Sequence, residues 1–315
     1  MSGGILAALG AGLLWGLVFV APLLLPDYPG AILSFGRYAA FGLVALIPAW
    51  FDRKAIAGLS WSNWIVATKL SLIGNILYYA TLSIAIKLAD APLPTMLIGT
   101  LPVVIAIFSN WTSPDASERM EWRKLVVPLG FIFLGLMLVN AAELHYLEGK
   151  RSMSAYLQGG ITALLAVAAW TWYPIVNARF MKAHRDIGSS TWATAQGLAT
   201  LPLALTGFIL FGVANSFGLI TSPYDFPLGA HPMRFVVVMV ILGVTASWIA
   251  TLLWNHAAQK LPTTLAGTLI VFETLAALGY TFILRGTMPG GQILAGVGLL
   301  CAGVALSVRF FQQTK

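Results

Sequence analysis

Residues 232–258 read PMRFVVVMVILGVTASWIATLLWNHAA and contain one charged side chain, that of Arg234. An α-helix rises about 1.5 Å per residue, so a run of this length can cross the hydrocarbon core of a bilayer, which is about 30 Å thick. The stretch therefore predicts a membrane-spanning helix. The rest of the chain follows the same pattern, because charged residues make up only 9% of its 315 residues, against about 25% in soluble proteins.

Ten apolar stretches of this kind cover most of the sequence. They lack the alternation of apolar and polar residues that is typical of barrel strands. No basic residue precedes the first stretch, so we expect a retained helix and not a cleaved signal peptide. The sequence predicts an all-α integral membrane protein with ten transmembrane helices. The predicted spans are residues 4–25, 30–50, 63–87, 91–110, 124–141, 154–180, 190–213, 232–258, 262–284 and 290–310.

The basic residues between these spans predict the orientation. With a cytoplasmic N-terminus, the inner connections hold eleven basic residues and the outer ones five. The inner residues are Arg53, Lys54, Arg119, Arg123, Lys124, Arg179, Lys182, Arg185, Lys260, Arg309 and Lys315, and the outer ones are Lys87, Lys150, Arg151, Arg234 and Arg285. The positive-inside rule then places both termini in the cytoplasm. We expect the protein to be located in a bacterial inner (plasma) membrane. The net charge of +7 follows from this bias, and we expect no binding to nucleic acid.

The chain has the pattern of a duplication. Residues 14–17 and 169–172 both contain a mid-span tryptophan, and residues 85–91 align with residues 257–263 as tight turns before a helix rich in small residues. The predicted repeats are residues 1–145 and 150–315, with five helices each. An odd number of helices inverts the second repeat, so we expect two inverted-topology five-helix repeats, which are typical of secondary transporters.

These features resemble a known family. The five-plus-five arrangement, the two alanine-rich turns, residues 177–179 (Asn-Ala-Arg) and residues 272–274 (Phe-Glu-Thr) are similar to the EamA-type drug/metabolite transporter superfamily. Within it, the aromatic-rich third and eighth helices resemble the branch of the aromatic amino-acid exporter YddG. The resemblance implies an exporter of amino acids and related metabolites, with the fifth and tenth helices at the periphery and no ATP-binding domain.

Glu273 is the only acidic residue near the centre of a predicted span. A carboxylate costs several kcal/mol at the bilayer centre, so it is protonated, paired or placed in a watery cavity. The residue alone leaves two interpretations open. Glu273 either contacts a substrate ammonium or couples protons, or it is a neutral packing or gating residue bonded to a neighbouring helix. His256 is a second candidate for gating or proton coupling, although a bonded histidine at a helix end is the more common case.

Several helix faces carry aromatic and polar side chains at helical spacing, which suits a small amphipathic ligand. The candidate substrate-binding residues are Asn75, Tyr78, Tyr79, Trp170, Tyr173, Ser247, Trp248, Thr251, Asn255 and Tyr280. Packing between helices is the alternative, because Ser, Thr and Asn commonly form hydrogen bonds between membrane helices.

Other side chains have simpler interpretations. Arg37 and Lys69 lie in spans but close to an end, so we expect them to snorkel. We assign Cys301 to the core as a small residue. Five tryptophans near span ends are assigned to interfacial anchoring, namely Trp61, Trp64, Trp111, Trp122 and Trp192.

The sequence predicts a secondary transporter of neutral and aromatic amino acids that works by alternating access. A broad-specificity exporter, with or without proton coupling, is the alternative. An intramembrane enzyme is less favoured, because one acid and one histidine on successive helices do not form a catalytic constellation. We expect no cofactor and no metal, a small-molecule substrate, a lipid bilayer as the surroundings and a monomer. The Gly12–Gly16 spacing leaves internal packing and dimerisation both open.

Overall fold

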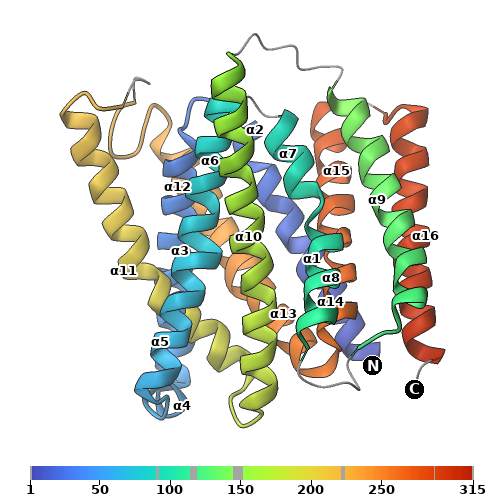
Figure 1. Ribbon diagram of the computed structural model, residues 1–315. Helices are drawn as coiled ribbons and strands as arrows, with labels where there is room; N and C mark the ends of the chain where they lie inside the picture. Colours follow the sequence, from blue (N-terminus) through green and yellow to red (C-terminus); the bar gives the residue numbers. More distant parts are fainter. Residues whose placement is uncertain are drawn as a thin grey trace.

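The computed structural model describes residues 2–89, 92–113, 119–144, 152–220, 224–286 and 288–313 (Figure 1). Within these ranges the chain folds into helices and short connections, with no strand. The first part contains α1 (Ser2–Gly16), η1 (Leu17–Phe19), α2 (Ala21–Leu24), α3 (Gly30–Phe51), α4 (Arg53–Ala57), α5 (Trp61–Leu70), η2 (Ser71–Leu77), α6 (Tyr78–Ala89), α7 (Pro92–Gly99), α8 (Leu101–Thr112) and α9 (Trp122–Leu144). The second contains α10 (Met153–Ala183), α11 (Ser189–Ser216), α12 (Pro232–Leu242), η4 (Gly243–Ile249), α13 (Ala250–Lys260), α14 (Thr263–Leu269), α15 (Val271–Arg285) and α16 (Gly291–Gln313).

In the described part of the chain, nine helical segments are long and apolar enough to cross a membrane. Nine of the ten predicted spans correspond to them within a few residues. The remaining prediction, residues 91–110, is divided at Thr100 into α7 and α8, each too short to span alone. Pro102 lies in the first turn of α8, where its missing N–H interrupts the hydrogen bonding of a continuous helix.

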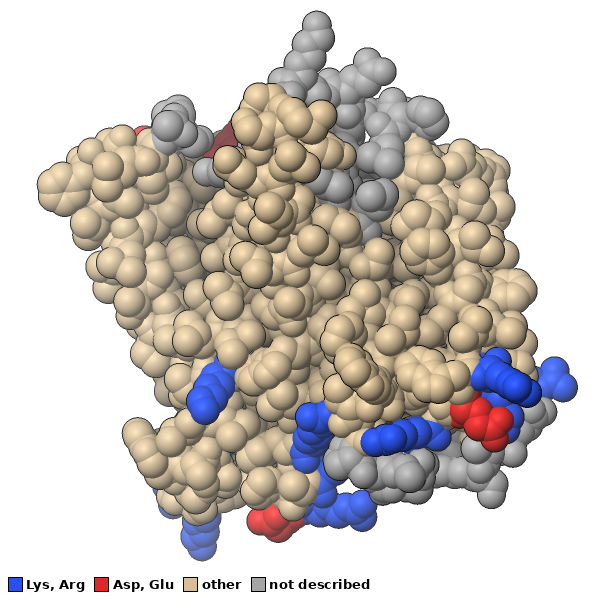
Figure 2. Space-filling view, in the orientation of Figure 1, with Lys and Arg blue, Asp and Glu red and all other residues tan. Residues whose placement is uncertain are grey.

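Both chain termini lie at the same end of the bundle, at the lower right of Figure 1. We call this the terminus end and the opposite one the distal end. On the face shown in Figure 2, the described Lys and Arg side chains gather at the terminus end. The middle of the bundle on that face shows no charged side chain, as expected for a surface in contact with lipid.

Small residues bring the helices together, and large apolar residues face outward. Ala7, Ala8 and Ala11 of α1 are buried, whereas Leu6 on the same helix is 69% exposed. This inside-out distribution suits a lipid solvent, in which close approach of backbones drives association between helices. Helices α9 and α16 pack against each other at one edge of the bundle (Figure 1).

Two helices wind into π-helical turns in the middle of the bundle. They are η2, which joins α5 to α6, and η4, which joins α12 to α13. Such turns place an extra residue in one turn and occur often at functional sites. They carry Asn75 and Ser247, two of the predicted site residues.

The assignments of Trp192 and Cys301 from the sequence were wrong. Trp192 does not anchor the protein at an interface, because its side chain is fully buried, stacks on Phe180 at 3.9 Å and donates a hydrogen bond to Asn177. Cys301 does not belong to the core but is exposed on α16. Apolar character alone does not distinguish a side chain that faces lipid from one packed between helices.

Candidate functional site

A cavity of about 390 Å³ lies in the centre of the bundle. It extends from the middle of the spans toward the distal end, because its lining includes Pro22 of α2 and Ile86, Asn140 and Thr281 near the distal ends of α6, α9 and α15. Other lining residues come from α1, α3, η2, α7, α8, α10, η4 and α13. Segments from both parts of the sequence therefore enclose one space.

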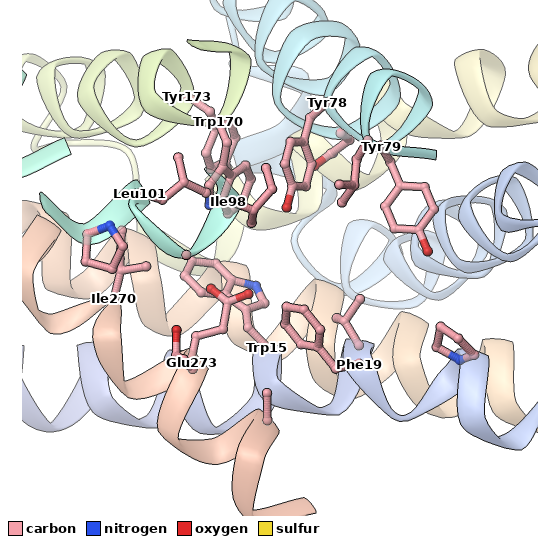
Figure 3. A pocket seen from close by; sticks show the side chains of 18 of the residues that line it. Trp15, Phe19, Tyr78, Tyr79, Ile98, Leu101, Trp170, Tyr173, Ile270 and Glu273 are labelled. Atoms are coloured by element: carbon pink, nitrogen blue, oxygen red, sulfur yellow. The ribbon is translucent and has the colours of Figure 1, made fainter. Parts of the chain in front are cut away.

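Stacked aromatic rings form one wall of this cavity (Figure 3). Trp170 of α10 stacks with both Tyr78 and Tyr173, with ring centroids 5.1 Å apart in each pair and interplanar angles of 24° and 3°. Trp15 of α1 meets Trp170 edge-on at 5.8 Å. Such a wall offers apolar contact and also a surface for a cation.

Glu273 contributes a carboxylate to the same cavity. Figure 3 shows its side chain directed from α15 into the open space beside Trp15. Among the described residues, no hydrogen bond or ion pair satisfies this carboxylate. The backbone of Glu273 packs tightly against α1, because a Cβ added at Gly12 of α1 would lie 3.0 Å from the backbone nitrogen of Glu273.

Arg37 of α3 also lines the cavity, and this contradicts the expectation that it snorkels. Its Nε donates to Ser247 Oγ at 3.0 Å and its Nη2 to the carbonyl oxygen of Ala246 at 3.0 Å. The guanidinium lies 5.0 Å from the ring centre of Tyr38. These contacts hold Arg37 inside the bundle, against the π-helical turn η4.

Eight of the twelve predicted site residues lie together in the cavity lining. They are Asn75, Tyr78, Tyr79, Trp170, Tyr173, Ser247, Thr251 and Glu273. The side chains of two of them form hydrogen bonds to residues outside the lining. Asn75 donates to Thr200 at 3.3 Å, and the buried Tyr173 hydroxyl donates to Gln196 at 2.9 Å.

The other four predicted residues lie outside the lining of this cavity. Trp248 packs with Tyr38 and Phe41 and donates from its indole nitrogen to Thr194 at 3.1 Å. Tyr280 donates to the carbonyl oxygen of Leu13 at 3.1 Å, and His256 lies on α13, nearer the terminus end.

Asn255, the last of the four, belongs to a buried hydrogen-bond network between the cavity and the terminus end. It accepts a hydrogen bond from Asn177 Nδ2 at 2.9 Å. Asn177 Oδ1 in turn accepts from Trp192 at 2.9 Å and from Gln196 at 3.2 Å. Because these groups are buried and bonded to each other, they hold α10, α11 and α13 together at this level of the bundle.

Further contacts hold α8, α10 and α14 together at the terminus end. Arg179 donates to the carbonyl oxygen of Thr112 at 2.6 Å, and Lys182 donates to Thr263 at 3.0 Å. The buried hydroxyls of Ser109 and Thr264 lie 3.4 Å apart. These contacts lie between the cavity and the terminus end and hold that end of the bundle together.

The lining also includes residues that the helical-spacing argument missed. Asn140 of α9 has a buried amide nitrogen without a hydrogen-bond partner in the described part of the chain. Tyr38 lies beside Arg37 on α3. A polar residue in an otherwise apolar span was the available signal for Asn140, but it did not show which helix face points inward.

Comparisons with known proteins indicate the family of this chain. A sequence model of the EamA-like transporter family matches residues 2–141. Inner membrane protein YtfF of Escherichia coli (strain K12) is 44% identical over 311 residues, which cover 98% of this chain and 96% of that protein. An uncharacterized transporter of Archaeoglobus fulgidus is 22% identical over 83% of this chain and 82% of its own.

A solved crystal structure has the same fold, with a TM-score of 0.75 and 20% sequence identity over 98% of both chains. With its apolar helices and a close relative in an inner membrane, this chain is an integral membrane protein. It belongs to the EamA-like transporter family.

Proposed function

We propose that this protein is a secondary transporter that exports neutral amino acids, aromatic ones among them, and related metabolites by alternating access. The observation that carries the proposal is the central cavity, lined by stacked aromatic rings, one carboxylate and one guanidinium. Its volume lies within the range of small-molecule sites, about 300–1,000 Å³. The aromatic lining fits the branch of the aromatic amino-acid exporter YddG.

Internal symmetry supports alternating access. The π-helical turns η2 and η4 begin at Ser71 and Gly243, and the helix breaks lie at Thr100 and Ile270. Both pairs are separated by about 170 residues, close to the offset between the two alanine-rich turns. We infer ten spans in two inverted repeats, with α7 and α8 forming one broken span. The predicted boundary, residues 145–150, lies outside the described residues.

The charge distribution supports an orientation with both termini in the cytoplasm. We infer from the buried contacts between the cavity and the terminus end that this end is closed. It then faces the cytoplasm, and the cavity faces outward. In this state the protein would release an exported substrate, and the contacts at the terminus end must part before the next one enters.

We propose a monomer in the lipid bilayer as the working form, with no nucleic-acid partner. The small residues of the Gly12–Gly16 motif support this, because both pack inside the protein against α15. A broad-specificity exporter remains the second candidate. The apolar residues of the lining, among them Phe19, Ile98 and Leu278, favour this second candidate.

Uptake into liposomes tests the proposal. The purified protein is reconstituted, and uptake of labelled amino acids is measured with and without a proton gradient, with protein-free liposomes as the control. We expect saturable uptake of neutral and aromatic amino acids. Absence of uptake for every amino acid would contradict the assignment and leave the broad-specificity exporter. Uptake that requires the gradient and is lost in Glu273→Gln would identify proton coupling, whereas indifference to the gradient would identify a facilitative carrier.

A further inference from the structure

We propose that Arg37 and Glu273 together select zwitterions, with Arg37 binding the carboxylate of the substrate and Glu273 its ammonium group. The inference rests on the proposed function, because it names the residues that would recognise an amino acid in the transport cavity. It predicts a substrate class defined by two opposite charges beside an apolar or aromatic side chain.

Arg37 lines the cavity and retains one guanidinium nitrogen without a partner among the described residues. Two of its three guanidinium nitrogens are bonded to the η4 turn, as described above, and Nη1 has no hydrogen-bond partner among the described residues. The two bonds fix the plane of the group without neutralising its charge, because a serine hydroxyl and a backbone carbonyl are neutral acceptors. A fixed guanidinium with a remaining donor is suited to a carboxylate.

Glu273 is the proposed acceptor for the ammonium group of the substrate. It has no partner in the described chain, and it projects into the cavity beside Trp15 (Figure 3). A carboxylate attracts an ammonium group, and aromatic faces next to it strengthen the preference for a cation. Trp15 and the stack of Tyr78, Trp170 and Tyr173 provide such faces.

Arg37 and Glu273 are not joined by a direct ion pair. The one ion pair within 4.0 Å among the described residues joins Lys124 to Glu121 at the surface, so Arg37 and Glu273 face one cavity unpaired. Unpaired charges in a membrane interior are costly. A zwitterion would supply both counter-charges at once, whereas a simple amine or a simple acid would leave one of them unmatched.

Ligand binding to the unmodified protein gives the first test. Equilibrium binding to the purified protein is measured for L-phenylalanine, for phenethylamine, which lacks the carboxylate, and for 3-phenylpropionate, which lacks the ammonium. We expect each truncated compound to bind about 30-fold more weakly than phenylalanine, the size expected for one charged hydrogen bond. Equal affinity for phenylalanine and either truncated compound would overturn the inference.

Variants of Arg37 then test whether this residue binds the substrate carboxylate. In Arg37→Gln, phenylalanine affinity should fall about 30-fold while phenethylamine affinity stays unchanged, and Arg37→Lys should lie between Gln and Arg. Lys69→Gln is the matched control, because Lys69 is an exposed cation in a neighbouring span outside the cavity lining. An equal fall for both ligands in Arg37→Gln would show a merely structural role and overturn the assignment.

The two proposals fail in different ways. If the protein neither binds nor transports phenylalanine or any other amino acid, the proposed function fails. If it transports phenylalanine but binds phenethylamine equally well, the transporter assignment stands and the selection of zwitterions by Arg37 and Glu273 is wrong.

Discussion

Gly16 marks the closest approach of α1 to α15, next to the cavity. A Cβ at this position would lie 2.7 Å from the Cβ of Ala276 and 2.8 Å from the backbone nitrogen of Ala277. Neither atom is the flexible end of a side chain, so a methyl group must separate the two helices. The Gly12–Gly16 motif therefore serves packing within this protein.

The substitution Gly16→Ala tests this packing. We expect it to destabilise the protein by about 1–3 kcal/mol, the usual cost of overpacking a closely packed site. Thermal unfolding of the purified protein in detergent is the measurement. Gly279→Ala in α15 is the control, because nothing lies within 4 Å of a Cβ at that position. A drop in melting temperature that is the same for both variants would contradict the account.

The sequence singled out Glu273, which lies in the cavity lining, but it did not indicate that Arg37 lies there too. A single mid-span acid is conspicuous, because membrane interiors exclude charge. Arg37 lies only seven residues after the start of α3, where a long side chain can also reach water. Its inward direction depends on the contact with η4, and Ser247 lies 210 residues away in the chain. Local sequence carries no information about that contact.

The short helices α8 and α14 form part of the closure at the terminus end. Ser109 and Thr264 are both buried there, with hydroxyl oxygens 3.4 Å apart. If the protein works by alternating access, α8 and α14 must move apart at this point to admit substrate from the cytoplasm.

A cross-link between these elements tests the movement. In a Cys301→Ser background, Ser109→Cys and Thr264→Cys are combined, and uptake in liposomes is measured after oxidation and again after reduction. We expect oxidation to stop transport and reduction to restore it. The two single-cysteine variants are the controls. Full transport with the disulfide formed would show that this end does not open between α8 and α14.

Helix positions were predictable from the sequence, whereas helix irregularities were not. Predicted spans such as 30–50 and 232–258 agree with the structure within two residues, since length and apolarity are set by the bilayer. The spacing of apolar residues in the sequence does not indicate the π-helical turns at Ser71–Leu77 and Gly243–Ile249. They depend on the packing of neighbouring helices, and Asn75 and Ser247 reach the cavity through them.

On the scale of the whole molecule, the proposed orientation in the membrane rests on the basic residues at the terminus end. Ser62 is exposed at the start of α5 at this end, and Ser216 is exposed at the distal end of α11. In intact cells carrying the Cys301→Ser background, a membrane-impermeant maleimide should label Ser216→Cys but not Ser62→Cys. Permeabilised cells, in which both should react, are the control. The reverse labelling pattern would invert the proposed orientation.

The direction of the cavity could not be predicted from the sequence. Aromatic and polar helix faces indicated that a central site exists, and eight of the twelve predicted residues lie in its lining. Which end is closed depends on buried hydrogen bonds between distant helices, such as that from Asn177 to Asn255. Asn255 is therefore part of the closure, although its helical spacing suggested the cavity.

The central claim is that this cavity is the pathway for amino acids. Counterflow of labelled phenylalanine into liposomes tests it, with Trp170→Ala compared with Trp50→Ala. Trp170 lies in the aromatic stack of the cavity, whereas Trp50 is 70% exposed on α3. We expect counterflow by the unmodified protein, a loss of about tenfold or more in Trp170→Ala and no change in Trp50→Ala. Equal transport by the two folded variants would contradict the account.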